Sequence, residues 1–240
     1  MTAATTTPTA TIAVVAKECL PGRVKTRLSP PFTPEQAAVI AQACVDDTLE
    51  TVSAVAARLA PSAPVRRVLF FDGTVVPPSA AGFEVVPQVE GGLDVRLAHL
   101  FDVCDGPTVL IGMDTPQVDA DLLTELCTDW PAGVDAWFGA AEDGGFWLLG
   151  LREPTGALLR GVPMSVPTTG AETRARLGAA GLTVVDVPEL LDIDSATDAT
   201  RVAGLLPGSR LAAVLATMPA VAAVAAVAAV AAPAAGVGSA

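Results

Sequence analysis

A cluster of positive charges is the first feature of this sequence that could do chemistry. Only 14 of the 240 residues are basic, yet four of them fall within positions 17–27, including both lysines of the chain. Phosphate groups are bound by several cations that converge on them and by backbone N–H donors in a turn. We therefore predict a nucleotide-binding loop, with a solvated basic loop as the alternative. The predicted phosphate-binding residues are Lys17, Pro21, Gly22, Arg23, Lys25, Thr26 and Arg27.

A carboxylate in the turn Gly112-Met113-Asp114-Thr115-Pro116 is the second feature. A Mg²⁺ or Mn²⁺ ion that bridges phosphate oxygens needs hard oxygen ligands, usually one or two carboxylates. We predict Asp114 as the first metal ligand. An Asp-Thr-Pro turn without any ligand is the alternative, because these residues are common in turns.

Two more carboxylates alternate in Asp192-Ile193-Asp194-Ser195. If this stretch is extended, both carboxylates point the same way, and either could complete a metal site with Asp114. Asp194 is the second predicted metal ligand. The alternative is that Asp194 or Ser195 caps the helix that follows, with Asp198 in its first turn.

The turn Glu142-Asp143-Gly144-Gly145 separates two apolar runs. A β-hairpin whose glycines adopt positive φ explains it adequately. Two glycines also let a ligand approach the backbone, and Asp143 could orient or deprotonate an acceptor hydroxyl. We assign Asp143, Gly144 and Gly145 to the acceptor side, and Asp143 and Lys25 to catalysis.

Alternating strands and helices must position these loops. Short apolar runs predict buried strands, and apolar residues at helical spacing predict helices. Such alternation implies a three-layer α/β/α fold with a mostly parallel central sheet and a ligand crevice at the carboxyl ends of its strands. The predicted strands are 12–16, 65–71, 83–87, 108–111, 134–140, 146–151 and 182–187, and the predicted helices are 33–59, 93–104, 119–129, 170–180 and 196–206.

The composition fits one compact α/β domain. The chain is 51% hydrophobic and 17% charged, as expected for a buried, mostly parallel sheet. Its net charge of −12 argues against a nucleic acid polymer as partner. The four cysteines show neither zinc-site nor disulfide spacing, and the N-terminus does not have the form of a secretory signal, so we expect a cytoplasmic protein.

The two ends of the chain differ from its middle. We predict a flexible N-terminus over 1–10, one nucleotide-binding domain over 11–210, and a low-complexity tail over 211–240 that is helical only in part. Residues 220–232 are all Ala or Val, but thirteen residues are too few to span a bilayer. No stable membrane insertion is therefore expected, with a membrane anchor or a partner-docking helix as the alternative.

The four motifs, in this order and spacing, resemble one bacterial family, the GT-A-type glycosyltransferase-like rSAM/selenodomain-associated transferase 1 family. The likeness covers roughly residues 11–206. The Lys-Thr-Arg-Leu loop is also similar to that of 2-phospho-L-lactate guanylyltransferase, a related nucleotidyltransferase. The stretches that carry the likeness are Pro21-Gly22-Arg23-Val24-Lys25-Thr26-Arg27-Leu28, Gly112-Met113-Asp114-Thr115-Pro116, Ala141-Glu142-Asp143-Gly144-Gly145-Phe146 and Asp192-Ile193-Asp194-Ser195.

This resemblance implies a GT-A (nucleotide-diphospho-sugar transferase) fold, a sugar nucleotide or nucleoside triphosphate as ligand, and a divalent cation at Asp114. The usual Asp-x-Asp reads Asp114-Thr115-Pro116 here, and Asp194 is the expected substitute for the missing carboxylate. The leading hypothesis is a Mg²⁺- or Mn²⁺-dependent glycosyltransferase-like enzyme that acts on a small-molecule acceptor. Nucleotidyl transfer to a phosphorylated acceptor is the alternative, and a non-catalytic nucleotide-binding module is the third.

Overall fold

The computed structural model describes residues 9–128 and 130–218. The chain divides into two compact units. The first unit comprises Met1–Glu18 and Cys44–Asp192, and the second comprises Cys19–Ala43 and Ile193–Ala240. Most of the predicted flexible N-terminus and of the predicted tail lies outside the described residues, and the prediction of one domain over 11–210 stays a prediction.

In the described part of the first unit, seven strands form one sheet in the order β3-β2-β1-β4-β6-β5-β7. Only β6 runs antiparallel to its neighbours, β4 and β5, so the predicted mostly parallel sheet is confirmed. The strands are β1 (Ala10–Lys17), β2 (Val65–Asp72), β3 (Glu84–Pro87), β4 (Thr108–Gly112), β5 (Ala136–Ala141), β6 (Phe146–Leu151) and β7 (Val184–Leu190).

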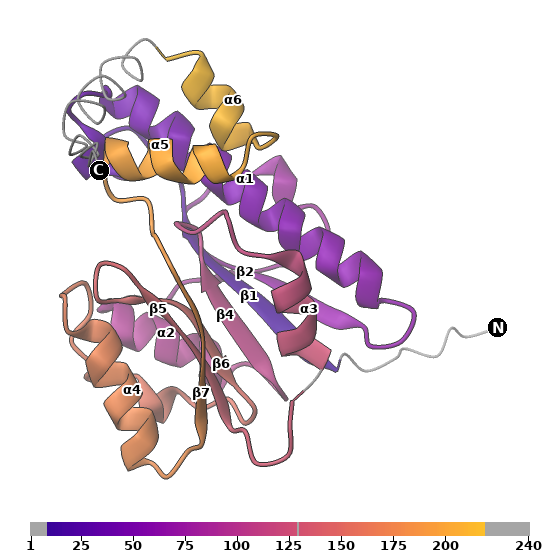
Figure 1. The fold of residues 1–240 in the computed structure, drawn as a ribbon. Helices are drawn as coiled ribbons and strands as arrows, with labels where there is room; N and C mark the ends of the chain where they lie inside the picture. The colour runs from indigo at the N-terminus through magenta and orange to yellow at the C-terminus, as the bar shows by residue number, and fades with distance from the viewer. Residues whose placement is uncertain (1–8, 129, 219–240) are drawn as a thin grey trace, which may run out of the picture. The chain divides into compact units, whose positions relative to one another are not determined.

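Helices cover both faces of this sheet (Figure 1). On one face, α2 (Leu93–Asp102) and α4 (Thr169–Ala179) enclose a core to which β1, β2, β4, β5 and β6 all contribute. On the other face lie α3 (Ala120–Thr128) and the part of α1 (Pro34–Leu59) from Cys44 onward, and Arg58 of α1 is ion-paired with Asp121 of α3. The three-layer α/β/α fold is therefore confirmed.

The apolar sequence of β1 explains why this strand lies in the centre of the sheet. Residues Ala10 to Val14 are buried without interruption, because β1 pairs with β2 on one side and β4 on the other while helices cover both faces. A strand buried on both faces has no polar alternation. At its carboxyl end, Lys17 lies in register with Asp72 of β2, and Val15 with Gly112 of β4. The first basic residue of the loop thus ends β1, and the Asp114 turn follows the neighbouring strand β4.

The second unit contains the start of α1, α5 (Ala196–Leu205) and α6 (Arg210–Ala216). Helix α1 begins as predicted: the Thr33 hydroxyl accepts from the Gln36 N–H at 3.3 Å, and the Gln36 side chain accepts from the Thr33 N–H at 2.9 Å. This reciprocal pair is a capping box. Helix α6 packs against α5 and buries Leu211 and Leu215, so the segment predicted as tail begins with a packed helix.

Most predicted boundaries differ from the structure by one to three residues. Helix α2 ends at Asp102 rather than residue 104, and β5 begins at Ala136 rather than residue 134. Strand β7 covers Val184–Leu190 rather than 182–187, and it includes Pro188. Proline is tolerated there because β7 is an edge strand, whose outward backbone donors need no partner in the sheet.

Two further features concern the helices and the cysteines of the described residues. None of the described helices is both long and apolar enough to cross a membrane. All four cysteines are unbridged. Burial raises the pKa of the Cys104 thiol, and it raises that of Cys127 to about 12, so both thiols are poor nucleophiles at neutral pH.

Candidate functional site

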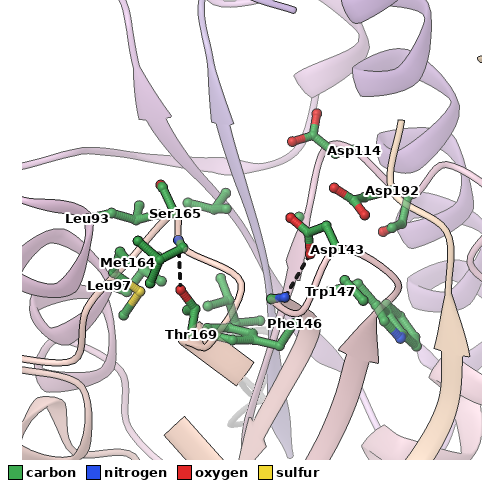
Figure 2. A pocket seen from close by; sticks show the side chains of 17 residues that line it. Leu93, Leu97, Asp114, Asp143, Phe146, Trp147, Met164, Ser165, Thr169 and Asp192 are labelled. Carbon is green, nitrogen blue, oxygen red and sulfur yellow. Dashed lines mark hydrogen bonds between the residues drawn. The ribbon is translucent and has the colours of Figure 1, made fainter. Parts of the chain in front are cut away.

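The first unit has a cavity of about 220 Å³ where the carboxyl ends of β1 and β4 meet the β5–β6 turn (Figure 2). The β5–β6 hairpin, the start of α2, the segment before α4 and the residue after β7 contribute the remaining walls. Parallel α/β sheets bind ligands at this edge, because strand ends and the loops that follow them converge there. The crevice is thus at the edge where the sequence predicted it.

Three carboxylates line the cavity: Asp114, Asp143 and Asp192. Asp114 follows β4 by two residues, Asp143 lies at the turn of the β5–β6 hairpin, and Asp192 follows β7 by two residues. Carboxylate oxygens of Asp143 and Asp192 lie within 4.8 Å of each other. Figure 2 shows the three side chains along one side of the cavity. The structure thus brings together three acidic motifs that are separate in the sequence.

Backbone contacts hold two of these carboxylates in place. Asp143 Oδ1 accepts from the Gly145 N–H at 2.7 Å, inside its own turn. The Asp192 segment is attached to the hairpin, because the Glu142 N–H donates to the Leu190 carbonyl at 3.1 Å. The Gln117 side chain, on the loop that carries Asp114, also donates to the Leu191 carbonyl at 2.6 Å. Gln117 therefore links the Asp114 and Asp192 segments.

The structure shows why a glycine is needed at position 144 of the hairpin, which the sequence did not indicate. Gly144 has φ +88°, and a Cβ atom there would lie 2.1 Å from the carbonyl oxygen of Pro167. The Gly170 N–H donates to the Gly144 carbonyl at 2.8 Å. The backbone that approaches Gly144 is therefore that of the segment before α4. The predicted hairpin is present, but of its two glycines only Gly144 has a positive φ. The acceptor-side role of Gly144 and Gly145 stays a prediction.

Three hydroxyl residues also line the cavity: Thr115, Ser165 and Thr169. Thr115 is 1% exposed, and no group in the described part of the chain hydrogen-bonds its hydroxyl. Ser165 has φ +60°, a left-handed conformation that costs a non-glycine residue about 1–2 kcal/mol. Strained backbone and unsatisfied buried hydroxyls are both more frequent at ligand sites than elsewhere.

The basic loop belongs mainly to the second unit. Its Pro21-Gly22 pair forms a turn closed by the Arg23 N–H, which donates to the Leu20 carbonyl at 3.0 Å, with Gly22 at φ +72°. Lys25 is left-handed at φ +47°. Pro21, Gly22, Arg23, Thr26 and Arg27 are exposed.

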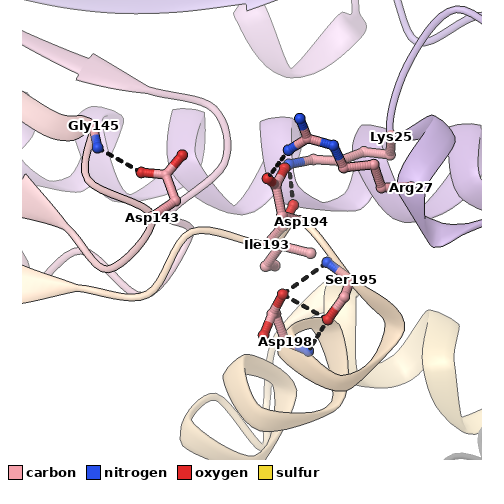
Figure 3. A network of polar contacts seen from close by, with 8 residues as sticks. All are labelled: Lys25, Arg27, Asp143, Gly145, Ile193, Asp194, Ser195 and Asp198. Carbon is pink, nitrogen blue, oxygen red and sulfur yellow. Dashed lines mark hydrogen bonds and ion pairs between the residues drawn. The ribbon is translucent and has the colours of Figure 1, made fainter. Parts of the chain in front are cut away.

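Two of the loop's cations contact residues 193–194 of the same unit (Figure 3). Lys25 Nζ donates to the Ile193 carbonyl, and Arg27 forms an ion pair with Asp194 in which the side chains are 74% and 38% exposed. A predicted phosphate ligand is therefore paired with a predicted metal ligand. From the sequence, Arg27 was predicted to bind phosphate and Asp194 to bind the metal ion.

The structure decides the capping alternative for the last motif. Ser195 caps α5: its hydroxyl accepts from the Asp198 N–H at 3.2 Å, and the Asp198 side chain accepts from the Ser195 N–H at 2.7 Å. Ser195 and Asp198 are thus structural here, whereas Asp194 is not the cap. Lys17 and Asp114 belong to the first unit, and Lys25 and Asp194 to the second. Whether they share ligands, as the sequence predicts, stays a prediction.

Gln88 and Arg96 were missed by sequence reasoning. Gln88 Nε2 donates at 3.0 Å to the carbonyls of Ala16 and Phe70, at the carboxyl ends of β1 and β2. Arg96 contacts Asp72 at 2.9 Å and Gln88 Oε1 at 3.3 Å. This network fixes the strand ends next to Lys17. The available signal was a glutamine and an arginine on either side of a Gly-Gly turn that follows a strand.

The family of the chain follows from comparison with known proteins. A bacterial family model described as "Uncharacterized protein conserved in bacteria (DUF2064)" matches residues 47–166, half of the chain. The chain belongs to this family. The match includes the Asp114 turn and the β5–β6 hairpin, and it excludes the basic loop and the Asp192 segment. No curated protein matches the chain.

Two solved structures resemble the fold of this chain. A protein from Desulfovibrio desulfuricans G20, assigned as a nucleotide-diphospho-sugar transferase, superimposes with a TM-score of 0.76 at 23% identity, over 90% of this chain and 97% of that one. A nucleotidyl transferase from Methanothermobacter gives a TM-score of 0.52 at 15% identity, over 83% and 98%. At these identities the likeness concerns the fold, and it confirms the predicted GT-A-like architecture.

Proposed function

We propose that this DUF2064 protein is a metal-dependent transferase that uses a nucleotide-diphospho-sugar donor and a small-molecule acceptor. The observation that carries the proposal is the convergence of Asp114, Asp143 and Asp192 on one cavity at the carboxyl edge of the sheet. Within the wider family, we place the chain with the rSAM/selenodomain-associated transferase 1 proteins that its motifs resemble. We also propose a cytoplasmic location.

The carboxylates fit a divalent cation. Mg²⁺ and Mn²⁺ prefer hard oxygen ligands, and Mg²⁺ binds them at about 2.0–2.1 Å, commonly through one or two carboxylates with water completing the shell. We propose Asp114 and Asp192 as the ligands, because each directly follows a strand of the sheet and lines the cavity. When bound, the ion would offset the negative charge that develops on the leaving diphosphate. Asp192 thereby takes the role that the sequence assigned to Asp194.

The basic residues remain our proposal for the donor's phosphates. Lys17 ends β1, and Arg23, Lys25 and Arg27 follow it on the loop. Ammonium and guanidinium groups bind phosphate oxygens through charge-assisted hydrogen bonds. The left-handed conformation of Lys25 supports a functional role, because strain at a non-glycine residue is more common at ligand sites.

We propose Asp143 as the group that receives the acceptor's proton. The acceptor hydroxyl oxygen forms a bond to the anomeric carbon of the donor sugar, and the bond from that carbon to the diphosphate oxygen breaks. The bonding electrons leave with the nucleoside diphosphate, and the hydroxyl proton moves to the Asp143 carboxylate. Its contact with the Gly145 N–H fixes the orientation of this carboxylate, which a general base requires.

Nucleotidyl transfer is the rival reaction. There, the acceptor attacks the α-phosphate of a nucleoside triphosphate and pyrophosphate leaves. Turnover separates the two: release of pyrophosphate from GTP or CTP with a phosphorylated acceptor would reject glycosyl transfer. A non-catalytic module would bind nucleotide without turnover under any metal or acceptor.

The direct test is calorimetric titration of the full chain with nucleoside triphosphates and diphospho-sugars, each with and without Mg²⁺ or Mn²⁺. We expect metal-dependent binding of diphospho-sugars. The Asp143→Asn variant should retain Mn²⁺ binding and lose turnover. If this variant loses Mn²⁺ binding, Asp143 is a metal ligand and its role as proton acceptor is wrong.

A further inference from the structure

The cavity has two chemically different sides. Figure 2 shows Asp114, Asp143 and Asp192 along one side, whereas Leu93, Leu97 and Met164 lie across from them. Leu97 is 3% exposed and Leu93 is 38% exposed, so the apolar side extends from the core to the cavity's opening. A ligand that fills this space must place a polar group at one end and hydrocarbon at the other.

The charges of the lining all have one sign. Among the described residues, neither lysine nor arginine lines the cavity, whereas three carboxylates do. A single divalent ion would balance two of these carboxylates, and the loop cations proposed above would be occupied by the donor's phosphates, so the lining keeps negative charge. A phosphorylated acceptor would therefore meet a negative potential without a cation of its own.

The remaining polar groups of the lining suit an uncharged ligand. The buried Thr115 hydroxyl has no hydrogen-bond partner within the described chain, and an alcohol or ether oxygen could supply one. Met164 is a flexible, polarizable side chain that adapts to hydrocarbon of varied shape. The cavity thus offers neutral hydroxyl groups, an acidic side and an adaptable apolar side.

We infer that the acceptor is a small uncharged alcohol with an apolar body, and that it is not phosphorylated. Its hydroxyl lies toward Asp143, and its body packs against Leu93, Leu97 and Met164. This inference rests on the proposed function, since it names the substrate class of the same cavity. It also separates this chain from transferases that act on phosphorylated acceptors.

Methionine methyl NMR of the full chain tests the inference, because the chain has four methionines and, among those that the structure describes, only Met164 lines the cavity. The probes are matched pairs: benzyl alcohol with benzyl phosphate, and cyclohexanol with cyclohexyl phosphate. We expect the Met164 signal, assigned by the Met164→Leu variant, to shift saturably with each alcohol. The phosphates should bind at least tenfold more weakly.

A pair of variants on α2 provides the control. Leu93→Asp places a charge on the apolar side and should weaken alcohol binding at least tenfold, whereas Val103→Asp, at the opposite end of the helix, should leave it unchanged. Both side chains are about 40% exposed, so both variants should fold. Equal effects of the two variants would contradict docking against the apolar side.

Two results would overturn the inference: tighter binding of the phosphates than of the alcohols, or no shift of Met164 with any probe. Metal-dependent donor binding, measured separately in the absence of probes, reports on the proposed function. If donor binding persists while the alcohols fail, the acceptor class is wrong and the transferase proposal stands. If donor binding fails, the proposed function is wrong whatever the alcohols do.

Discussion

The acidic cavity and the basic loop are held in place differently. The three carboxylates of the cavity follow β4, β5 and β7, and backbone hydrogen bonds and the Gln117 side chain fix the Asp143 and Asp192 segments. Three of the four cations, by contrast, lie on the loop of the second unit, where Lys25 and Arg27 contact residues 193–194. The carboxylates are thus positioned by the sheet and the cations by a loop.

This difference suits the proposed roles of the two groups, metal coordination by the carboxylates and phosphate binding by the cations. Coordination of a metal ion tolerates little error in ligand position, whereas attraction between exposed cations and phosphates falls off gradually with distance. Loss of one cavity carboxylate should therefore cost more than loss of one loop cation. The variants below test that ranking, from the largest expected effect to the smallest.

Asp192→Asn should reduce turnover by about 100- to 1000-fold, the range seen when one preorganised electrostatic group of an active site is removed. Its Mn²⁺ affinity should fall in parallel, measured by calorimetry. Asp105→Asn is the matched control, because Asp105 is exposed and precedes β4 at the opposite, amino end of the strand. An Asp192→Asn enzyme with normal metal affinity would remove Asp192 from the site.

Gly144→Ala tests the hairpin that carries Asp143. The new Cβ would meet the Pro167 carbonyl and also pay the left-handed conformational cost, so we expect a loss of about 3 kcal/mol in unfolding free energy. Gly106→Ala shares the positive φ but has no atom within 4 Å, and it should lose only about 1–2 kcal/mol. Denaturant unfolding measures both. Equal losses would mean that the close approach of Pro167 contributes nothing.

Lys25→Ala should weaken nucleotide binding by about 10- to 100-fold while the fold stays intact, since a hydrogen bond to a charged group contributes about 1.5–3 kcal/mol. Calorimetry gives the affinity and circular dichroism reports on the fold. Asp114→Ala should weaken the same binding only when a divalent metal is present. If both variants bind nucleotide normally, the proposed site is wrong.

The Arg27–Asp194 ion pair should show the smallest effect. Both side chains are more than a third exposed, and exposed ion pairs contribute about 0–1 kcal/mol. A double-mutant cycle with Arg27→Ala and Asp194→Ala should give a coupling to stability within that range. A coupling well above it would show that the loop is held as firmly as the cavity.

The sequence predicted much of the fold because the signals were local. The continuous apolar run of β1 and the Thr33-Pro34 start of α1 each reflect short-range chemistry, and both elements formed as expected. Asp114 was likewise found at a strand end. A partly helical tail was predicted from residue 211, but the packing of α6 against α5 was not, because the composition of α6, dominated by Ala, Val and Leu, resembles that of the low-complexity residues that follow.

The arrangement of the candidate site could not be predicted in the same way, because it depends on contacts between distant strands. The approach of Asp143 to Asp192 follows from the pairing of β5 with β7, whose register shifts between Gly139 and Ala141. The contacts of Gln88 depend on two neighbouring strand ends. A short sequence motif predicts neither the register shift nor which strand ends lie next to each other.

A Mn²⁺ titration of the methionine methyl signals tests the central claim most directly, because Met113 precedes Asp114 and Met164 lines the same cavity. Paramagnetic Mn²⁺ bound by the carboxylates should broaden both signals at substoichiometric metal. The broadening should persist in Asp105→Asn and disappear in Asp192→Asn. Signals that stay sharp, or broadening that Asp192→Asn does not change, would contradict a metal site in this cavity.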